Sequence, residues 1–319
     1  MSNSRHLVMP EAHAVLDTFG NALNADSVAG LRAMMQQLVD NMPPPPQDGV
    51  TVQERRVPGP AGGKDVRVLI YTPPALRGRL PVHIDIHGGG YIAGNADIDA
   101  ALCRALCLAV GCAVVSVDYQ LAPEVRYPGA VEECYAVLQW VQREGAALGF
   151  DTTRITIGGE SAGGGHCATL AIRARDRGGP PILLQVLGQP MLDDRTGSTS
   201  DPHPYTGEFV WTAHLNRLGW GSLLGVEAGS ARVPAEAVPA RVENLAKLPP
   251  TFIVVGALDL FVEESIEYAR RLMRAGVPTE LHVLPGGFHG SAMLVPEAAL
   301  SRAYVQLQFE AIKRAFGSS

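Results

Sequence analysis

Apolar and polar positions follow two different patterns in the first third of the chain. In VTVQERRVPG and DVRVLIYTP they alternate, and this period of two predicts antiparallel strands with one covered face. The segments LPVHIDIHG and CAVVSVDY are almost continuously apolar, which is typical of strands that are covered on both faces. The patterns therefore predict a sheet in which the later strands are the most deeply buried.

Beyond residue 95, helical patterns alternate with further strand patterns. The helical stretches lie at about 96–110, 129–147, 161–177, 262–275 and 296–315, and the later strands are RITIGG, ILLQVLGQP, TFIVVGA and TELHVLP. This alternation predicts an α/β protein whose mostly parallel sheet carries helices on both faces. Right-handed crossovers place the carboxyl ends of parallel strands along one edge, where open α/β sheets bind ligands.

Two segments fall outside this alternation. Residues 1–50 contain two helical patterns, about 10–24 and 26–41, followed by the proline run Pro43 to Pro46. Prolines cannot continue a helix, so the run predicts a stiff connector, with a polyproline ligand as the alternative. A second segment, about 195–245, reads as a largely helical insertion above the ligand-binding edge. The chain thus divides into 1–50 and a main domain, 51–319, that contains the insertion.

Composition narrows the classes of function. The chain has 319 residues, 46% of them hydrophobic, and a formal net charge of −6. It is long enough for one large core, and the mild acidity argues against a nucleic-acid partner. There is no apolar run of about 18 residues and no apolar core like that of a signal peptide, so a cytoplasmic protein without a membrane span is expected. Five scattered cysteines do not resemble a disulfide framework and are interpreted as buried apolar residues.

The stretch TIGGESAGGGHC contains the most specific chemical signal. Gly159 to Gly163 form a G-x-S-x-G sequence between a predicted strand and a predicted helix, the context of a strained turn that exposes a nucleophilic serine, here Ser161. A phosphate-binding loop or an ordinary tight turn is the rival interpretation. The Rossmann and Walker glycine patterns do not fit this stretch, because the first needs G-x-G-x-x-G near the first strand and the second needs a lysine.

A second glycine run, HGGGY, follows the strand LPVHIDI. The N–H groups of Gly88 and Gly89 are predicted to face an oxyanion together with the N–H of Ala162. We interpret His87 as a structural residue that holds the loop through backbone hydrogen bonds.

Two further residues complete a catalytic set. Asp259 follows the strand TFIVVGA, and His289 follows the strand TELHVLP. The order Ser161, Asp259, His289 is that of the Ser…Asp…His hydrolases, in which the histidine takes the serine proton and the aspartate orients the imidazole. The rival titratable residues near the same edge are interpreted as structural: His282, Asp193, Asp194, Glu263 and Glu264.

Over nearly its whole length the chain resembles the hormone-sensitive-lipase-like branch of the α/β-hydrolases. The motifs that carry the resemblance are HGGG, DYQLAPE, GESAGG, QPMLDD and GFHG. The resemblance implies an α/β-hydrolase fold with an eight-stranded sheet, and a helical cap formed by the N-terminal helices and the insertion. It also implies the triad and oxyanion hole named above. The chain departs from the family where Glu160 replaces the usual aspartate, Gln120 replaces a frequent arginine and DLFVE, with Glu263, replaces DPLxD.

The expected activity is that of a serine carboxylesterase that cleaves short-chain acyl esters through an acyl-enzyme. No metal or other cofactor is needed. The resemblance implies a small-molecule ester substrate and a homodimer formed through the sheet edge. Aromatic and apolar residues are candidates for the pocket wall or for packing of the cap, namely Tyr91, Phe209, Val210, Trp211, Leu215 and Trp220.

Two alternatives stay open at the level of sequence. One is hydrolysis of an amide, carbamate or lactone by the same triad, since the motif does not read the leaving group. The other is a non-catalytic receptor on this scaffold, which the presence of His289 argues against.

Overall fold

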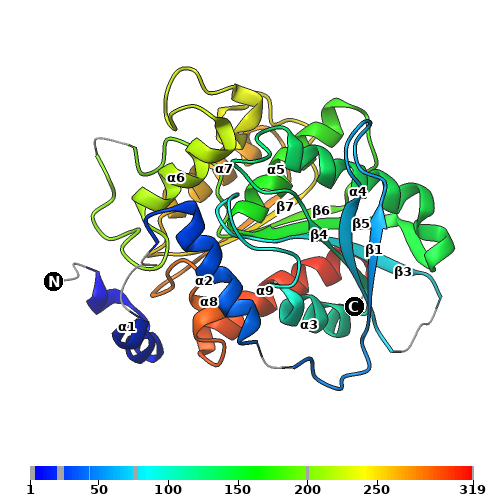
Figure 1. Cartoon of the computed structure of the whole chain (residues 1–319), viewed down its shortest axis with the longest axis horizontal. Coiled ribbons are helices and arrows are strands. Elements are labelled where there is room, and N and C mark those ends of the chain that lie inside the picture. Colours follow the sequence, from blue (N-terminus) through cyan, green and yellow to red (C-terminus); the bar gives the residue numbers. More distant parts are fainter. Residues whose placement is uncertain (1–3, 20–24, 43, 75–77, 199–200, 318–319) are drawn as a thin grey trace.

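The protein is described by a computed structural model that covers residues 4–19, 25–42, 44–74, 78–198 and 201–317. Its centre is one eight-stranded sheet, seen nearly edge-on in Figure 1. The strands are β1 Thr51–Val57, β2 Val66–Thr72, β3 Leu80–Ile86, β4 Ala113–Asp118, β5 Phe150–Glu160, β6 Leu184–Gly188, β7 Thr251–Gly256 and β8 Thr279–Leu284. Their spatial order is β1-β2-β4-β3-β5-β6-β7-β8.

Strand direction follows the hydrophobic pattern. β2 pairs antiparallel with β1 and with β4, whereas all other neighbours are parallel. The alternating segments thus form the antiparallel edge, whereas β3 is buried at every position, including its polar residues His83 and Asp85. The predicted α/β architecture with a mostly parallel, eight-stranded sheet is confirmed.

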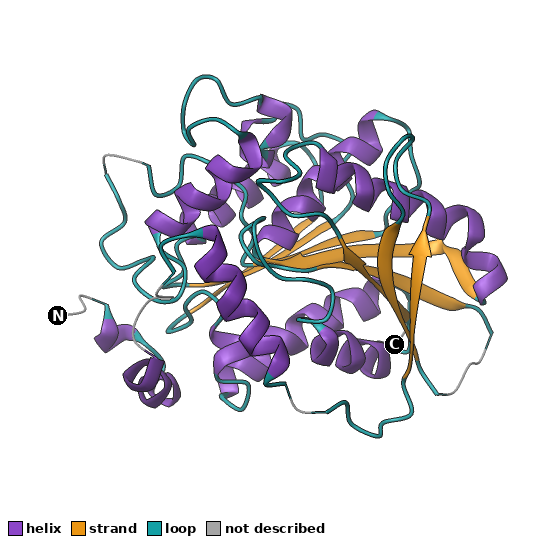
Figure 2. Cartoon of the chain, viewed as in Figure 1, coloured by secondary structure: helices purple, strands orange, loops and turns teal. Residues whose placement is uncertain are grey.

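Helices cover both faces of the sheet (Figure 2). On one face the helices α4 Gly129–Glu144, α5 Ala162–Asp176 and α7 Val262–Arg274 pack in one apolar cluster with the inner strands. On the other face α3 Ala100–Val110 and α9 Ala299–Ala315 form a second cluster. Two apolar layers therefore hold the sheet rigidly, and its carboxyl edge can position reacting groups.

Further helices lie over the carboxyl edge. They are α1 His13–Phe19, α2 Val28–Asp40, α6 Ala213–Leu224 and α8 Ser291–Leu294, with short 3-10 helices at Arg5–Leu7, Pro10–Ala12, Ala235–Ala237 and Pro239–Arg241. A further 3-10 helix, Gly145–Leu148, lies at the opposite edge, just before β5. A third apolar cluster joins Leu31 of α2 to Leu215 and Trp220 of α6, so two segments about 190 residues apart in sequence form one cap. The assignment of 1–50 and 51–319 as separate units stays a prediction.

Several predicted boundaries shift in the structure. The helix expected at 96–110 begins at Ala100, because Asp118 accepts a hydrogen bond from the backbone N of Ala96 and holds the preceding turn. The final helix begins at Ala299 rather than at 296. The insertion at 195–245 contains one α-helix, α6, and is otherwise mainly loop.

The N-terminal helix expected at 10–24 is shorter where it is described. It comprises a 3-10 turn and α1, and residues 20–24 lie outside the described residues. Pro43 also lies outside them, and 44–46 form neither helix nor strand.

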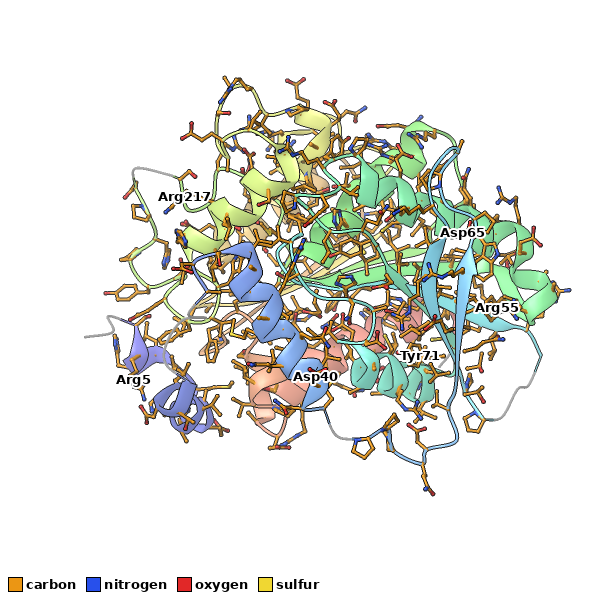
Figure 3. The ribbon with its side chains drawn as sticks, in the orientation of Figure 1. Arg5, Asp40, Arg55, Asp65, Tyr71 and Arg217 are labelled. Carbon is orange, nitrogen blue, oxygen red and sulfur yellow. The ribbon has the colours of Figure 1, made fainter. Side chains whose placement is uncertain are left out.

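Charged side chains lie mainly at the periphery. Figure 3 places Arg217 on the cap side, and Arg55 and Asp65 on the side of β1 and β2. Within the described part of the chain, each helix is too short or too polar to cross a bilayer.

Candidate active site

Ser161 lies at the sharp turn between β5 and α5. Its backbone has φ 56° and ψ −117°, a conformation that non-glycine residues rarely adopt. Such strain persists only where the surroundings enforce it. Gly159 and Gly163 flank the turn, and a Cβ on either would collide with the carbonyl oxygen of Ile86 at the end of β3. The glycines are therefore required because the turn packs directly against the neighbouring strand.

The structure brings the three predicted catalytic side chains together. Nε2 of His289 lies 3.0 Å from Oγ of Ser161, and Nδ1 of His289 lies 2.8 Å from Oδ2 of Asp259. Asp259 is fully buried, and Ser161 and His289 are each only 6% exposed. The other carboxylate oxygen of Asp259 accepts the backbone N–H of Phe261 at 2.9 Å. Asp259 is thus fixed in an orientation that aims one oxygen at the imidazole.

Several backbone N–H groups near the nucleophile turn lack a protein acceptor in the described part of the chain. Gly88 lies against the nucleophile turn, since a Cβ on Gly88 would be 3.5 Å from Cβ of Ser161. Among the described residues, the N–H groups of Gly88, Gly89 and Ala162 donate to no protein acceptor. Ala162 is the first residue of α5, where the helix leaves its N–H groups unpaired. These three donors remain available for an oxyanion.

His87 is buried in the loop that carries these glycines. Its Nδ1 lies 2.7 Å from the carbonyl oxygen of Gly88, and its ring stacks on Tyr119 at 4.1 Å between centroids. Burial lowers the pKa of His87 to about 4, so the ring is neutral at pH 7. These contacts agree with the structural role expected from sequence.

Trp211 lies beside the triad. Its ring centroid is 6.0 Å from that of His289, and a Cβ on Gly90 would collide with the indole. The indole N–H donates to Oδ1 of Asn216 at 3.2 Å. The side chain of Leu215 belongs to the same buried cluster as Trp211. Trp211 therefore lies between the cap and the glycine loop after β3, residues 87–90, called the oxyanion loop below.

Tyr91 and Phe209, two of the other pocket candidates, have different surroundings. The hydroxyl of Tyr91 donates to the carbonyl oxygen of Met191 at 2.9 Å, and its ring packs on Trp220. Phe209 packs on Phe288, with 5.4 Å between ring centroids. Both side chains are thus engaged in packing of the cap against the body.

The rival titratable residues have their own partners. Asp194 is fully buried and forms an ion pair with Arg241 at 2.6 Å. Glu264 accepts the backbone N–H of Leu192 at 2.6 Å, and His282 contacts Glu280 at 2.8 Å. These contacts anchor loops and strand ends, as expected from sequence.

Gln189 was not singled out in the sequence. It follows β6, is 8% exposed and has a φ of 37°. Its side chain contacts Glu160, which precedes Ser161, and Gly290, which follows His289. The available signal was its position just after a buried strand, at the same edge as the catalytic residues.

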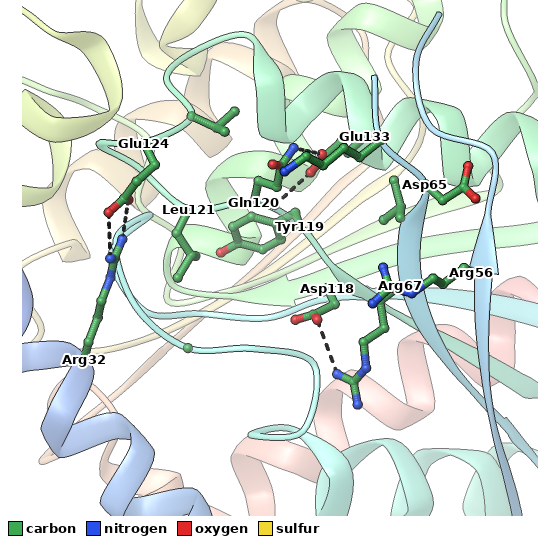
Figure 4. Close-up of a pocket in the computed structure, with 14 residues that line it drawn as sticks. Arg32, Arg56, Asp65, Arg67, Asp118, Tyr119, Gln120, Leu121, Glu124 and Glu133 are labelled. Atoms are coloured by element: carbon green, nitrogen blue, oxygen red, sulfur yellow. Dashed lines mark hydrogen bonds and ion pairs between the residues drawn. The ribbon is translucent and has the colours of Figure 1, made fainter. Parts of the chain in front are cut away.

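A charged cavity of about 490 Å³ lies away from the triad, beside β2 and the loop after β4 (Figure 4). Arg32 and Glu124 form an ion pair there, at 2.6 Å. Both the backbone N–H and the side chain of Gln120 donate to Glu133. Gln120 thus anchors this loop to α4, which accounts for one departure from the family pattern.

Potential metal ligands and cysteines are dispersed in the part of the chain that the structure describes. Among the described residues, no three His, Cys, Asp or Glu side chains are grouped as metal ligands. All five cysteines are buried and free.

The chain is similar to several proteins named as esterases. A family model described as the alpha/beta hydrolase fold matches residues 83–293. Esterase LipI of Mycobacterium tuberculosis strain ATCC 25618 / H37Rv is 36% identical over 316 residues, which cover 92% of each chain. Carboxylesterase NlhH of the same organism is 36% identical over 299 residues, or 91% of each chain.

The solved structure of a bacterial heroin esterase matches with a TM-score of 0.92 and 36% identity, covering 98% of both chains. Esterase LipW from Mycobacterium marinum matches with a TM-score of 0.83 and 35% identity, covering 99% of this chain and 98% of that one. The similarity therefore extends through the cap as well as the sheet.

Proposed function

Because the chain belongs to the hormone-sensitive-lipase-like branch of the α/β-hydrolase family and is a carboxylic-ester hydrolase, we propose that Ser161, His289 and Asp259 are its catalytic triad. The single observation that carries this assignment is the continuous chain of contacts from serine to imidazole to carboxylate, at 3.0 and 2.8 Å. Hydrogen-bond reach between nucleophile and base is the geometric requirement for this chemistry.

The reaction begins with attack of Oγ of Ser161 on the ester carbonyl carbon. The hydroxyl proton passes to Nε2 of His289, and the carbonyl π electrons move onto oxygen. The N–H groups of Gly88, Gly89 and Ala162 receive that negative charge. Removal of one such donor in other hydrolases costs about 10²–10³ in kcat. Preorganised amides cost no reorientation during the reaction, so they stabilise the charged intermediate efficiently.

The intermediate collapses as the bond from carbon to the alcohol oxygen breaks. The leaving alcohol takes the proton from Nε2 of His289, and an acyl group remains on Ser161. Water then attacks the acyl carbon while His289 accepts its proton, and the carboxylic acid leaves as Oγ recovers a proton. Asp259 holds Nδ1–H of the imidazole throughout and stabilises the imidazolium.

We propose short acyl esters as the preferred substrates. The triad is almost closed to solvent, and Trp211 fills the space above Gly90. A closed wall beside the oxyanion loop leaves little room for a long chain. Leu215, in the same cluster, extends this apolar wall, which suits a small aliphatic acyl group.

Two further expectations are kept as proposals. A homodimer would use β8, which is the last strand in the sheet order and carries the exposed Val283; sedimentation equilibrium would detect it. A cytoplasmic location would be tested by fractionation of the source cells.

The decisive experiment replaces the proposed nucleophile. Ser161→Ala is expected to abolish hydrolysis of p-nitrophenyl butyrate while the circular dichroism spectrum and thermal midpoint stay close to wild type. The reason is that alanine removes the attacking oxygen and little packed volume. Turnover by the variant at the wild-type rate would eliminate Ser161 as the nucleophile.

A further inference from the structure

Gln189 forms a bridge beneath the triad. Its Oε1 accepts the backbone N–H of Gly290 at 2.9 Å, and its Nε2 donates to Oε2 of Glu160 at 3.2 Å. The side chain is buried, and its backbone lies in the left-handed region, where a glutamine is strained. Strain of this kind marks positions that the surrounding structure holds for a purpose.

The two ends of the bridge are next to two of the three triad residues. Glu160 directly precedes Ser161, and Gly290 directly follows His289. The backbone beside Gln189 adds to this link, because the carbonyl oxygen of Gly188 accepts the N–H of Ser161 at 2.8 Å. The turn after β6 thus holds the nucleophile turn through the backbone and the histidine loop through the side chain.

The orientation of the amide is fixed by its partners. A backbone N–H can only donate, so Gly290 must face the oxygen of Gln189, and the NH₂ group must face Glu160. Glu160 also accepts hydrogen bonds from two side chains of α9, Nε2 of Gln308 at 3.0 Å and the hydroxyl of Tyr304 at 2.5 Å. A carboxylate that accepts from three donors is favoured in its ionised form.

We propose that Gln189 is a positioning residue for His289, which fixes the histidine loop over Ser161 by bonding both Gly290 and Glu160. The inference rests on the proposed triad. It gives Glu160, which stands where the family usually has aspartate, the role of anchoring Gln189. The longer side chain of glutamate reaches both α9 residues, and Gly188 leaves room for it, because a Cβ there would collide with the carboxylate.

The electrostatic surroundings of Glu160 support this anchoring role. Burial raises the pKa of Glu160, whereas Tyr304, Gln308, Gln189 and the charge of His289 act to lower it. The other titratable groups near Glu160 and the imidazole are Asp85, Asp99, Cys103, His83, Tyr304 and Asp259.

Gln189→Met tests the inference, because methionine keeps the length of the side chain but cannot make either hydrogen bond. We expect kcat for p-nitrophenyl butyrate to fall about 10-fold with little change in KM, since a misplaced base weakens the transition state more than substrate binding.

Glu160→Gln is the second variant, and it removes the charge at constant size. It should lower kcat in the same way, with little change in KM, and it replaces Gln189→Met as the test if that variant does not fold. Gln185→Met is the matched control, because Gln185 is buried on the same β6 strand but bonds Thr251 instead. Loss of stability alone would affect the control as well, without a selective fall in kcat.

A kcat within about twofold of the control in both test variants would overturn the inference. That result would leave the proposed triad intact as long as Ser161→Ala is inactive. An active Ser161→Ala would instead overturn the proposed function, so the two failures are distinguishable.

Discussion

At the scale of single residues, two of the non-glycine residues with positive φ, Ser161 and Val210, lie at or next to the candidate site. Ser161 has φ 56°, and Val210 has φ 61°. The N–H of Trp211 donates to the carbonyl oxygen of Phe209 at 2.8 Å, which closes a tight three-residue turn at Val210. A positive φ is unusual for a β-branched residue. The strain at Val210 therefore accompanies the placement of Trp211 beside His289.

Trp211→Ala is predicted to widen the acyl preference. Wild-type enzyme should cleave p-nitrophenyl butyrate much faster than the palmitate ester, because the indole closes the space above Gly90. In the variant, kcat/KM for the octanoate ester should rise about 10-fold relative to that for butyrate. The reason is that removal of the indole frees apolar space for the longer acyl chain, which clashes with Trp211 in the wild-type enzyme. The ratio of the two rates is the measurement.

Trp220→Phe serves as the control for this substitution. Trp220 is also a buried cap tryptophan, but its ring packs on Tyr91 at 4.9 Å. The Trp220→Phe variant should be less stable than wild type, with an unchanged ratio of octanoate to butyrate hydrolysis. An octanoate-to-butyrate ratio in Trp211→Ala equal to that of wild type would remove Trp211 from the pocket wall.

At the scale of elements, Arg32 supplies hydrogen bonds and an ion pair that attach α2 to the body, in addition to its apolar packing. Arg32 donates to the carbonyl oxygen of Ile92 at 2.7 Å and to that of Ala122 at 2.9 Å, and it forms an ion pair with Glu124. Ile92 follows the oxyanion loop closely in sequence. The attachment therefore connects an N-terminal cap helix to the segment that carries Gly88 and Gly89.

Arg32→Met is predicted to raise KM about threefold or more, with kcat changed by less than twofold. Methionine preserves much of the side-chain packing but leaves two carbonyl groups without their donor. The cap should then close less well over the substrate, whereas the triad, which α2 does not position, stays in place. Steady-state kinetics with the butyrate ester measures both constants.

Arg314→Met is the comparison for Arg32, because Arg314 forms an exposed ion pair with Glu280 far from α2. Exposed pairs contribute little, so its kinetics should match wild type. Equal KM values for the two variants would mean that α2 plays no part in substrate binding.

At the scale of the whole molecule, the layers around the sheet bury several histidines. Burial lowers the pKa of His83 and of His166 to about 3, and that of His87 to about 4. An unfolded histidine titrates near 6.5. Between these values the unfolded chain binds more protons than the native protein, so each buried histidine lowers the free energy of unfolding as pH falls below about 6.5.

His166→Gln is predicted to lessen the loss of unfolding free energy that accompanies a fall in pH. Between pH 7 and pH 5, a histidine that stays neutral when folded costs about 2 kcal/mol of stability. The difference in free energy of unfolding between variant and wild type should therefore shift by about 1–2 kcal/mol in favour of the variant over that interval. Urea unfolding at the two pH values measures it.

Comparison at two pH values isolates the histidine. Burial raises the pKa of Asp85 to about 6, and a carboxyl of this kind stabilises the fold as pH falls, which opposes the histidine effect. The contribution of Asp85 is common to both proteins and cancels in the difference. An identical pH dependence in variant and wild type would show that His166 is protonated equally in the folded and unfolded states.

The sequence alone determined the class of fold and the identity of the chemical groups. Periodicity depends on which faces of an element are covered, so the alternating and continuous runs were sufficient to predict a mostly parallel sheet with helices on both faces. The G-x-S-x-G turn, the glycine run after β3, and the order Ser161, Asp259, His289 predicted which residues meet at the carboxyl edge. These signals are local, because each depends on a residue's place at the end of a strand.

Only the tertiary structure decided contacts between segments far apart in the chain. The bridge from Glu160 through Gln189 to Gly290 joins β5, β6 and the loop after β8, and no local pattern records such a meeting. The same holds for the packing of Trp211 over Gly90, and for the engagement of Tyr91 and Phe209 in the cap. The observed start of α3 differs from the predicted one for a related reason. Asp118, at the end of β4, accepts a hydrogen bond from the backbone of Ala96 and fixes the turn before Ala100. Side-chain direction and long-range partners depend on how the layers pack, and that packing is a property of the whole chain.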